Sequence, residues 1–203
     1  MKEKIYIAGP LFSKAEKDFN LDINSYLNDI EHPTFLPQED GFDKASLVEK
    51  ITSSSKDAAT KEKELAKLNA DIFSKDIGEI ENSDLLLIIL DGRVPDEGAC
   101  VELGYAHAQG KVCIGLKTDS RTLQAGQDNP MITGCINKLA NSKEDLGKIL
   151  DSYRAENAGW KTIGVKVRID ELAVLNRQLN RLNYNTLGDL VKDLIAGKIT
   201  HVT

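Results

Sequence analysis

A run of six consecutive apolar residues at positions 85–90 (LLLIIL) is the feature that most restricts the fold of this chain. Polar residues bound the run on both sides, Ser83-Asp84 before it and Asp91-Gly92 after it. A continuous apolar run of this length is typical of a parallel strand that is buried on both faces. The run is too short for a membrane-spanning helix, which needs about 20 residues. We therefore expect an α/β protein with no membrane segment.

Strand-like and helix-like segments alternate along the rest of the first 120 residues. Strands are predicted at 5–8, 35–36 and 112–116, and helices at 13–30 and 99–108, the second helix being capped by Gly110. This alternation predicts a doubly wound, Rossmann- or flavodoxin-like parallel sheet. Ligands bind beyond the carboxyl ends of the strands in such sheets, so the loops after residues 8, 36, 90 and 116 are expected to line the pocket.

The segment between the second and third strands has a less regular pattern. Residues 38–41 are predicted to form a loop, and residues 44–68 are charged and rich in alanine. We interpret 44–68 as a mobile or weakly packed helix interrupted by the serines at 53–55, and we expect a separate helix at 70–81.

Charge and cysteine content restrict the class of protein. The net charge is 26 − 32 = −6, which gives little reason to expect a nucleic-acid partner for the whole chain. Cys100, Cys113 and Cys135 are too widely spaced for a disulfide framework or a metal-ligand cluster. The chain also enters its first strand without a charged and apolar leader. We therefore expect a cytoplasmic protein with buried free thiols.

Several carboxylates follow the predicted strands. Asp40 follows the second strand, Asp91 and Asp96 follow the third, and Glu102 lies one turn into the next helix. Each loop acid has a simpler interpretation as a solvated side chain. Glu102 differs, because the surrounding helix is small and apolar, and an isolated acid there is costly unless it is used or paired. Two carboxylates near a small-molecule site suggest glycosidic chemistry.

Three segments together resemble the nucleoside 2-deoxyribosyltransferases. They are IYIAGPLF at 5–12, DGRVPDEGACVELGYA at 91–106 and NPM at 129–131, and the resemblance covers about residues 4–140. It implies that 2-deoxyribose is transferred between nucleobases in nucleoside salvage, through a covalent deoxyribosyl-glutamate intermediate. The implied partners are a deoxynucleoside and a free nucleobase, and no metal or organic cofactor is required.

The resemblance also assigns roles to individual residues. Glu102 matches the nucleophile, Asp76 matches the acid that exchanges a proton with the base, and Tyr6 matches the tyrosine that orients the nucleophile. Asp96 matches the aspartate that binds the sugar hydroxyls, and Phe12 would stack on the base.

Further candidate substrate contacts are weaker. Gly9 permits a close approach of a ligand, and Asp40 is the candidate base contact. Asp91 and Arg93 are included as substrate-binding candidates: Arg93 favours a phosphate on the substrate, whereas the acidic residues around it argue against one. The resemblance implies that Asn129 and Met131 enter the active site of a neighbouring subunit, which makes the protein a homodimer or a larger homo-oligomer.

Residues 163–203 form a candidate extension beyond the catalytic domain (1–145) and a linker (146–162). The sequence 165–170 alternates as a half-buried strand does, and two leucine-rich helices follow. This β-α-α unit resembles a ribbon-helix-helix fold, in which Lys166 and Arg168 would contact DNA. Residues 160–203 also carry a local charge of +3, from seven basic and four acidic residues. A dimerisation or capping element is the alternative.

Two other functions stay open at this point. If water resolves the intermediate, the same residues make the protein an N-glycosidase of nucleosides or nucleoside 5′-monophosphates. The second alternative is a DNA-binding regulator whose α/β domain senses nucleosides.

Overall fold

The computed structural model describes residues 2–92, 94–121 and 128–156, together with Arg177 and Asp193. The chain divides into two compact units, Met1–Thr162 and Ile163–Thr203. The predicted β-α-α extension, with Lys166 and Arg168, lies outside the described residues, as does Arg93. The roles expected of the extension in dimerisation or DNA binding therefore stay predictions.

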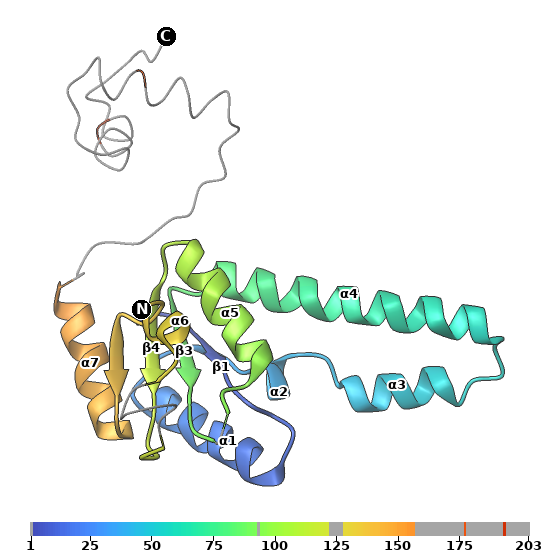
Figure 1. Ribbon diagram of the computed structural model, residues 1–203, viewed down its shortest axis with the longest axis horizontal. Helices are drawn as coiled ribbons and strands as arrows, with labels where there is room; N and C mark the ends of the chain where they lie inside the picture. The colour runs from blue at the N-terminus through green and yellow to red at the C-terminus, as the bar shows by residue number, and fades with distance from the viewer. Residues whose placement is uncertain (1, 93, 122–127, 157–176, 178–192, 194–203) are drawn as a thin grey trace. The chain divides into compact units, whose positions relative to one another are not determined.

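A five-stranded parallel sheet forms the centre of the first unit (Figure 1). Its order is β2-β1-β3-β4-β5, with bounds Thr34–Phe35, Ile5–Ala8, Leu85–Ile89, Val112–Leu116 and Lys138–Ala140. This is the flavodoxin-like order, in which the chain switches direction across the sheet between β1 and β3. The doubly wound α/β class predicted from the sequence is confirmed.

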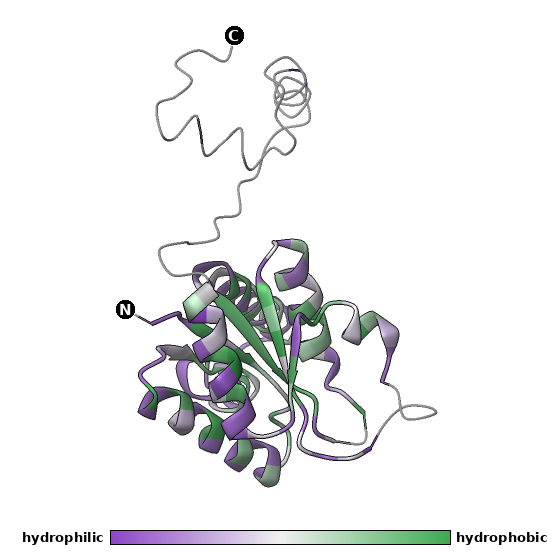
Figure 2. Ribbon diagram, turned by 90° about the vertical axis from the view of Figure 1, so that its left-hand side faces the viewer, coloured by the Kyte–Doolittle hydropathy of each residue, from purple (hydrophilic) through white to green (hydrophobic). Residues whose placement is uncertain are grey.

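Helices cover both faces of the sheet, and the strand residues divide between two cores. On one face, Ile5, Ile7 and Leu85 pack with buried residues of α1 (Lys14–Asp29) and α7 (Lys143–Glu156). On the other face, Tyr6, Ala8 and Leu86 pack with α4 (Ala58–Asn82) and α5 (Glu97–Ala108). Alternate residues of a strand point to opposite faces, which is why every residue of β3 is apolar. The central strands are accordingly hydrophobic in Figure 2.

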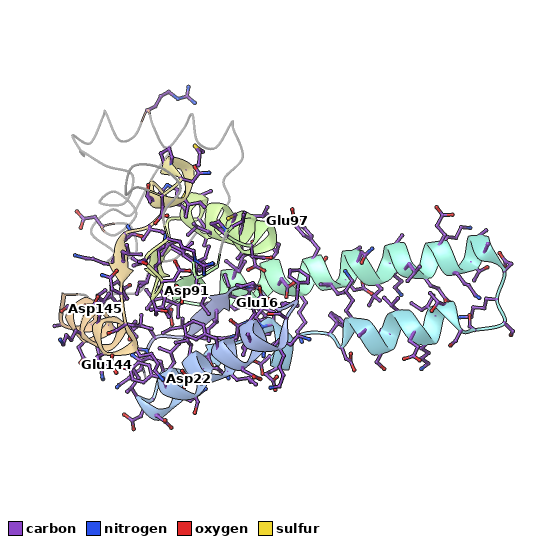
Figure 3. The ribbon with its side chains drawn as sticks, turned by 60° about the horizontal axis from the view of Figure 1, so that its bottom comes forward. Glu16, Asp22, Asp91, Glu97, Glu144 and Asp145 are labelled. Carbon is purple, nitrogen blue, oxygen red and sulfur yellow. The ribbon has the colours of Figure 1, made fainter. Side chains whose placement is uncertain are left out.

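Helix α7 corrects the predicted end of the catalytic domain at residue 145. The helix crosses that boundary, and its Leu146 and Leu150 are fully buried in the core. Lys143 Nζ also lies 2.8 Å from the carboxylate of Asp22 on α1; Figure 3 shows Asp22 near Glu144 and Asp145 of α7. Residues 146–156 therefore belong to the α/β unit and do not form a linker.

The segment between β2 and β3 differs from the prediction in two respects. Residues Pro37–Asp40 form a short helix, α2, where a loop was expected, because Pro37 occupies its first turn. The predicted helices at 44–68 and 70–81 are replaced by α3 (Lys44–Thr52) and the continuous α4, whose start is capped by Asp57. The expected break near residues 53–55 is present. Helices α3 and α4 extend side by side away from the sheet (Figures 1 and 3).

Two smaller observations concern the thiols and the membrane. The three cysteines are free; Cys113 is buried, and Cys100 and Cys135 are partly exposed, so the expectation of buried thiols holds only for Cys113. Within the described part of the chain, no helix is both long and apolar enough to cross a bilayer.

Candidate active site

The centre of the candidate site is a pair formed by Tyr6 of β1 and Glu102 of α5. The Tyr6 hydroxyl donates a hydrogen bond of 2.7 Å to Oε1 of Glu102. Tyr6 is fully buried and its ring stacks on Phe35 of β2, with 5.5 Å between the ring centroids. Burial, together with the negative charges of Glu102 and Asp76, raises the pKa of Tyr6 far above its usual range. Tyr6 is therefore a fixed, neutral hydrogen-bond donor to Glu102.

Glu102 titrates unusually high for a glutamate. Burial raises its pKa from 4.5 to about 7, and the charges of Asp76 and Asp96 add to this effect, while the hydrogen bond from Tyr6 opposes it. A carboxylate that is poorly solvated is a better nucleophile than one in water, and strongly shifted pKa values are typical of functional sites. Glu102 thus combines charge, burial and a fixed orientation.

Two other acids influence the charge of Glu102. Asp76, on the last turns of α4, is half-buried, and its burial raises the pKa of its carboxyl group, although the neighbouring Lys75 lowers it. Asp76 is therefore suited to hold a proton at a higher pH than an exposed aspartate. Asp96 caps the start of α5 and accepts a 2.8 Å hydrogen bond from the amide of Ala99. The structure thus brings Tyr6, Asp76 and Asp96 into the surroundings of Glu102.

A cavity of about 640 Å³ adjoins this group of acids. Its walls come from the loop after β1 and from α1, α2, α3 and α4, and they include Leu11, Lys17, Gln38, Phe42, Val48, Ile72 and Asp76. Asp76 connects the cavity to the Tyr6–Glu102 pair. Its side chain lines the cavity, and its charge raises the pKa of Glu102. The volume lies in the range that small-molecule sites occupy, roughly 300–1,000 Å³.

Gln38 and Phe42 line this cavity. Gln38 belongs to the segment after residue 36 that was expected to line the pocket, whereas Phe42 was not predicted from the sequence. Gln38 lies on α2, the helix that was expected to be a loop. The ammonium of Lys75 lies over two aromatic rings. Its Nζ is 5.4 Å from the ring centroid of Phe42 and 5.6 Å from the ring centroid of Phe35. The sequence offered one signal for the helix α2, which carries Gln38. That signal is Pro37, because proline favours the first position of a helix.

Two predicted substrate contacts already have structural partners. Oδ2 of Asp40 accepts a 2.8 Å hydrogen bond from the amide of Leu36 at the start of α2, and the side chain is largely exposed. Asp91 accepts hydrogen bonds from the amides of Thr118 and Asp119, which joins the loops after β3 and β4. Figure 3 labels Asp91, which follows β3, and Glu97, the first residue of α5.

The remaining predicted residues are not among those that line the cavity. A Cβ atom on Gly9 would lie 3.2 Å from Cβ of Ile89, so the start of the first loop packs closely against the end of β3. Phe12 and Met131 are 80% and 78% exposed in the single chain. Asn129 accepts a 3.0 Å hydrogen bond from the amide of Met131 and caps α6 (Pro130–Thr133). Phe12 and Met131 are therefore available for contact with a substrate or another chain.

A flavodoxin-like sheet with partly buried acids and a cavity beside the loop after its first strand has the architecture of an α/β enzyme that acts on a small molecule. The comparison with protein families makes this specific. The model of the nucleoside 2-deoxyribosyltransferase family matches residues 5–162, and the chain belongs to this family. The resemblance predicted from the sequence for about residues 4–140 is thus confirmed.

Two solved structures have a similar fold. A conserved protein from Enterococcus faecalis V583 is 27% identical and has a TM-score of 0.57, with 75% of this chain and 99% of that chain covered. A 2-deoxyribosyltransferase from Bacillus psychrosaccharolyticus is 20% identical and has a TM-score of 0.52, with 70% and 89% covered. Among curated proteins, none matches the chain significantly.

Proposed function

We propose that this protein transfers 2-deoxyribose from one nucleobase to another in nucleoside salvage, through a covalent ester on Glu102. The observation that carries the proposal is the 2.7 Å hydrogen bond from the buried Tyr6 to the partly buried Glu102, beside Asp76. Membership of the family supports nucleoside deoxyribosyltransferase or related N-glycosidase activity. The covalent intermediate and the transfer to a second base are the proposal's own content.

The first half-reaction releases the donor base. An oxygen of the Glu102 carboxylate bonds to C1′ of the deoxyribose while the C1′–N bond breaks. The electron pair of the C1′–N bond leaves with the base. Asp76 donates its proton to the departing base, so the base does not leave as an anion. Tyr6 holds Oε1 of Glu102, which leaves Oε2 for the bond to the sugar.

The second half-reaction reverses these steps with another base. A nitrogen of the acceptor base attacks C1′, the ester bond to Glu102 breaks, and the carboxylate is restored. Asp76 now takes the proton that the acceptor nitrogen loses, so it returns to its starting state. No net proton, electron or water is consumed in transfer, whereas water in place of the acceptor base would give free deoxyribose.

The other candidate residues complete the proposed site. Asp96 would bind the sugar hydroxyls, Phe12 would stack on the base, and Asn129 and Met131 would enter the site of a second copy of the chain. The high exposure of Phe12 and Met131 in the single chain supports this arrangement. Gly9, Asp40, Asp91 and Arg93 remain candidate substrate contacts; the hydrogen bonds already made by Asp40 and Asp91 favour structural roles for these two.

Incubation of the protein with deoxyinosine or thymidine, with and without a second free base, tests the proposal by chromatography of the products. Transfer predicts a new nucleoside only when the acceptor base is present and only when Glu102 is intact, with Glu102→Ala as the inactive variant. Free deoxyribose regardless of acceptor would establish hydrolysis instead. No turnover of any deoxynucleoside or its monophosphate would contradict both and favour a nucleoside-sensing role.

A further inference from the structure

Asn20 of α1 is a buried amide with an unusual set of contacts. Its side chain is 2% exposed, and its Nδ2 donates two hydrogen bonds, one of 2.7 Å to the carbonyl of Pro10 and one of 2.9 Å to Oε1 of Gln38. Oδ1 is buried and has no hydrogen-bond partner in the part of the chain that the structure describes. A flipped amide would place Oδ1 against two oxygen atoms, so the orientation of Asn20 is fixed.

One of the two acceptors lines the cavity, and the other is next in sequence to a residue that lines it. Pro10 lies in the loop after β1, beside the cavity residue Leu11, and Gln38 lies on α2 and lines the cavity itself. They are 10 residues before and 18 residues after Asn20 in the chain. A single buried side chain thus joins the first loop to the helix that forms the facing part of the pocket.

Asn20 also determines how the amide of Gln38 is oriented. Because Nδ2 of Asn20 can only donate, Oε1 of Gln38 must face it, and Nε2 of Gln38 then donates a 3.1 Å hydrogen bond to the carbonyl of Lys17. These contacts use one acceptor site and one N–H of the Gln38 amide. One acceptor site and one N–H remain, in a fixed order, on a side chain that lines the cavity.

A fixed donor and acceptor can distinguish amino bases from oxo bases. Adenine presents an amino donor beside a ring-nitrogen acceptor, whereas hypoxanthine presents a carbonyl acceptor beside a ring N–H donor. Cytosine and uracil differ in the same way. Because the sugar fixes the position of the base, only one of the two orders matches an amide that cannot rotate. A freely rotating amide would match both.

We infer that Asn20 is a positioning residue for base selection: by locking the Gln38 amide, it makes the site discriminate between 6-amino and 6-oxo purines, or between 4-amino and 4-oxo pyrimidines. This inference rests on the proposed function, because it takes the cavity to hold the nucleobase. Asn20 itself touches no substrate and acts only through Gln38. It is separate from the chemistry at Glu102 and Asp76.

The test compares kcat/KM for deoxyadenosine and deoxyinosine, and for deoxycytidine and deoxyuridine, with one acceptor base. The wild-type chain should prefer one member of the pair that it turns over by about 10-fold or more, since a bidentate contact contributes roughly 1–3 kcal/mol of discrimination. Asn20→Ala and Gln38→Leu should both move this ratio toward one. Asn28→Ala, an exposed amide on the same helix, should leave it unchanged.

A double-mutant cycle separates positioning from a general loss of structure. If Asn20 acts through Gln38, Asn20→Ala should change the ratio in the wild-type background and should not change it further in the Gln38→Leu background. A ratio near one in the wild-type chain, or an equal effect of Asn20→Ala in both backgrounds, would overturn the inference. Gln38 is only partly buried, so Gln38→Leu tests the base contact even if Asn20→Ala does not fold.

Direct binding keeps the two proposals distinguishable. Calorimetric titration with free adenine and with free hypoxanthine measures the same discrimination without turnover. A chain that binds the two bases differently, but forms no new nucleoside, would retain this inference and contradict transfer. A chain that transfers deoxyribose, but binds both bases equally with and without Gln38→Leu, would retain transfer and contradict the inference.

Discussion

Tyr6 and Glu102 are 96 positions apart in the chain, and the hydroxyl of the first donates a 2.7 Å hydrogen bond to the carboxylate of the second. The contact exists because β1 lies inside the sheet, between β2 and β3, and α5 packs on the face toward which Tyr6 points. It opposes the burial and the negative charges that raise the pKa of Glu102 to about 7. Most of the pH behaviour expected of the protein follows from this balance.

Tyr6→Phe should lower activity near pH 7 by about 10-fold or more, because a hydrogen bond to a charged group contributes roughly 1.5–3 kcal/mol. Without the hydroxyl, the pKa of Glu102 rises, so the acid limb of the kcat/KM profile should move to higher pH. The phenyl ring of the variant would keep the stack on Phe35. An acid limb at an unchanged pH would show that Tyr6 does not tune Glu102.

Glu102→Gln should stabilise the fold above pH 7 while abolishing activity. The pKa of Glu102 is 4.5 when unperturbed and about 7 in the folded chain, so between these values the folded state binds the extra proton. The wild-type chain therefore loses stability as pH rises through this window, by about 3 kcal/mol if the full shift is expressed. A neutral glutamine, which still accepts from Tyr6, removes that loss.

Urea unfolding at pH 4.5 and pH 8 measures this difference. Glu97→Gln, an exposed change on the same helix, is the matched control and should follow the wild-type pH dependence. Equal pH dependence in Glu102→Gln and wild type would contradict the raised pKa of Glu102.

Asp76→Asn should reduce kcat by about 10²- to 10⁴-fold, because the departing base loses its proton donor. It should also lower the pKa of Glu102, since the charge of Asp76 helps to raise it. A donor nucleoside whose base leaves easily as an anion should show a much smaller loss. If all donors lose activity equally, Asp76 has a role other than proton transfer.

Lys75→Met should raise the pKa of Asp76, because the ammonium of Lys75 lowers it in the native chain. The basic limb of the kcat profile should consequently move to higher pH. KM should also rise, because Lys75 contacts Phe42 in the cavity wall and donates to the carbonyl of Asp40. Lys67→Met, on an exposed part of α4, serves as the comparison and should change neither quantity.

Mixing two inactive variants tests whether active sites are shared between chains. One variant carries Glu102→Ala and the other carries Asn129→Ala with Met131→Ala. After unfolding and refolding together, a dimer with shared sites should regain about one quarter of wild-type activity, because half of the dimers are mixed and each has one intact site. No recovery in the mixture would indicate that each chain forms its site alone.

The fold class and much of the chemistry could be predicted from local patterns in the amino-acid sequence. The apolar run at 85–90 required a strand buried on both faces, and the alternation of segments required a parallel sheet, because these patterns depend on local spacing. Glu102 stood out in the same way, as an acid within an apolar helix. The family motifs then assigned Tyr6, Asp76 and Asp96, and the structure places all three near Glu102.

The tertiary structure alone decided which side chains meet and how strongly each is perturbed. The hydrogen bonds that Asp91 accepts from the loop after β4, and those that link Asn20 to Gln38, join segments whose separation in sequence carries no pattern. The pKa of Glu102 also depends on burial and on charges that come from α4 and the start of α5. Desolvation and hydrogen bonding act over a few ångströms in space, so they become determined only when the chain has folded.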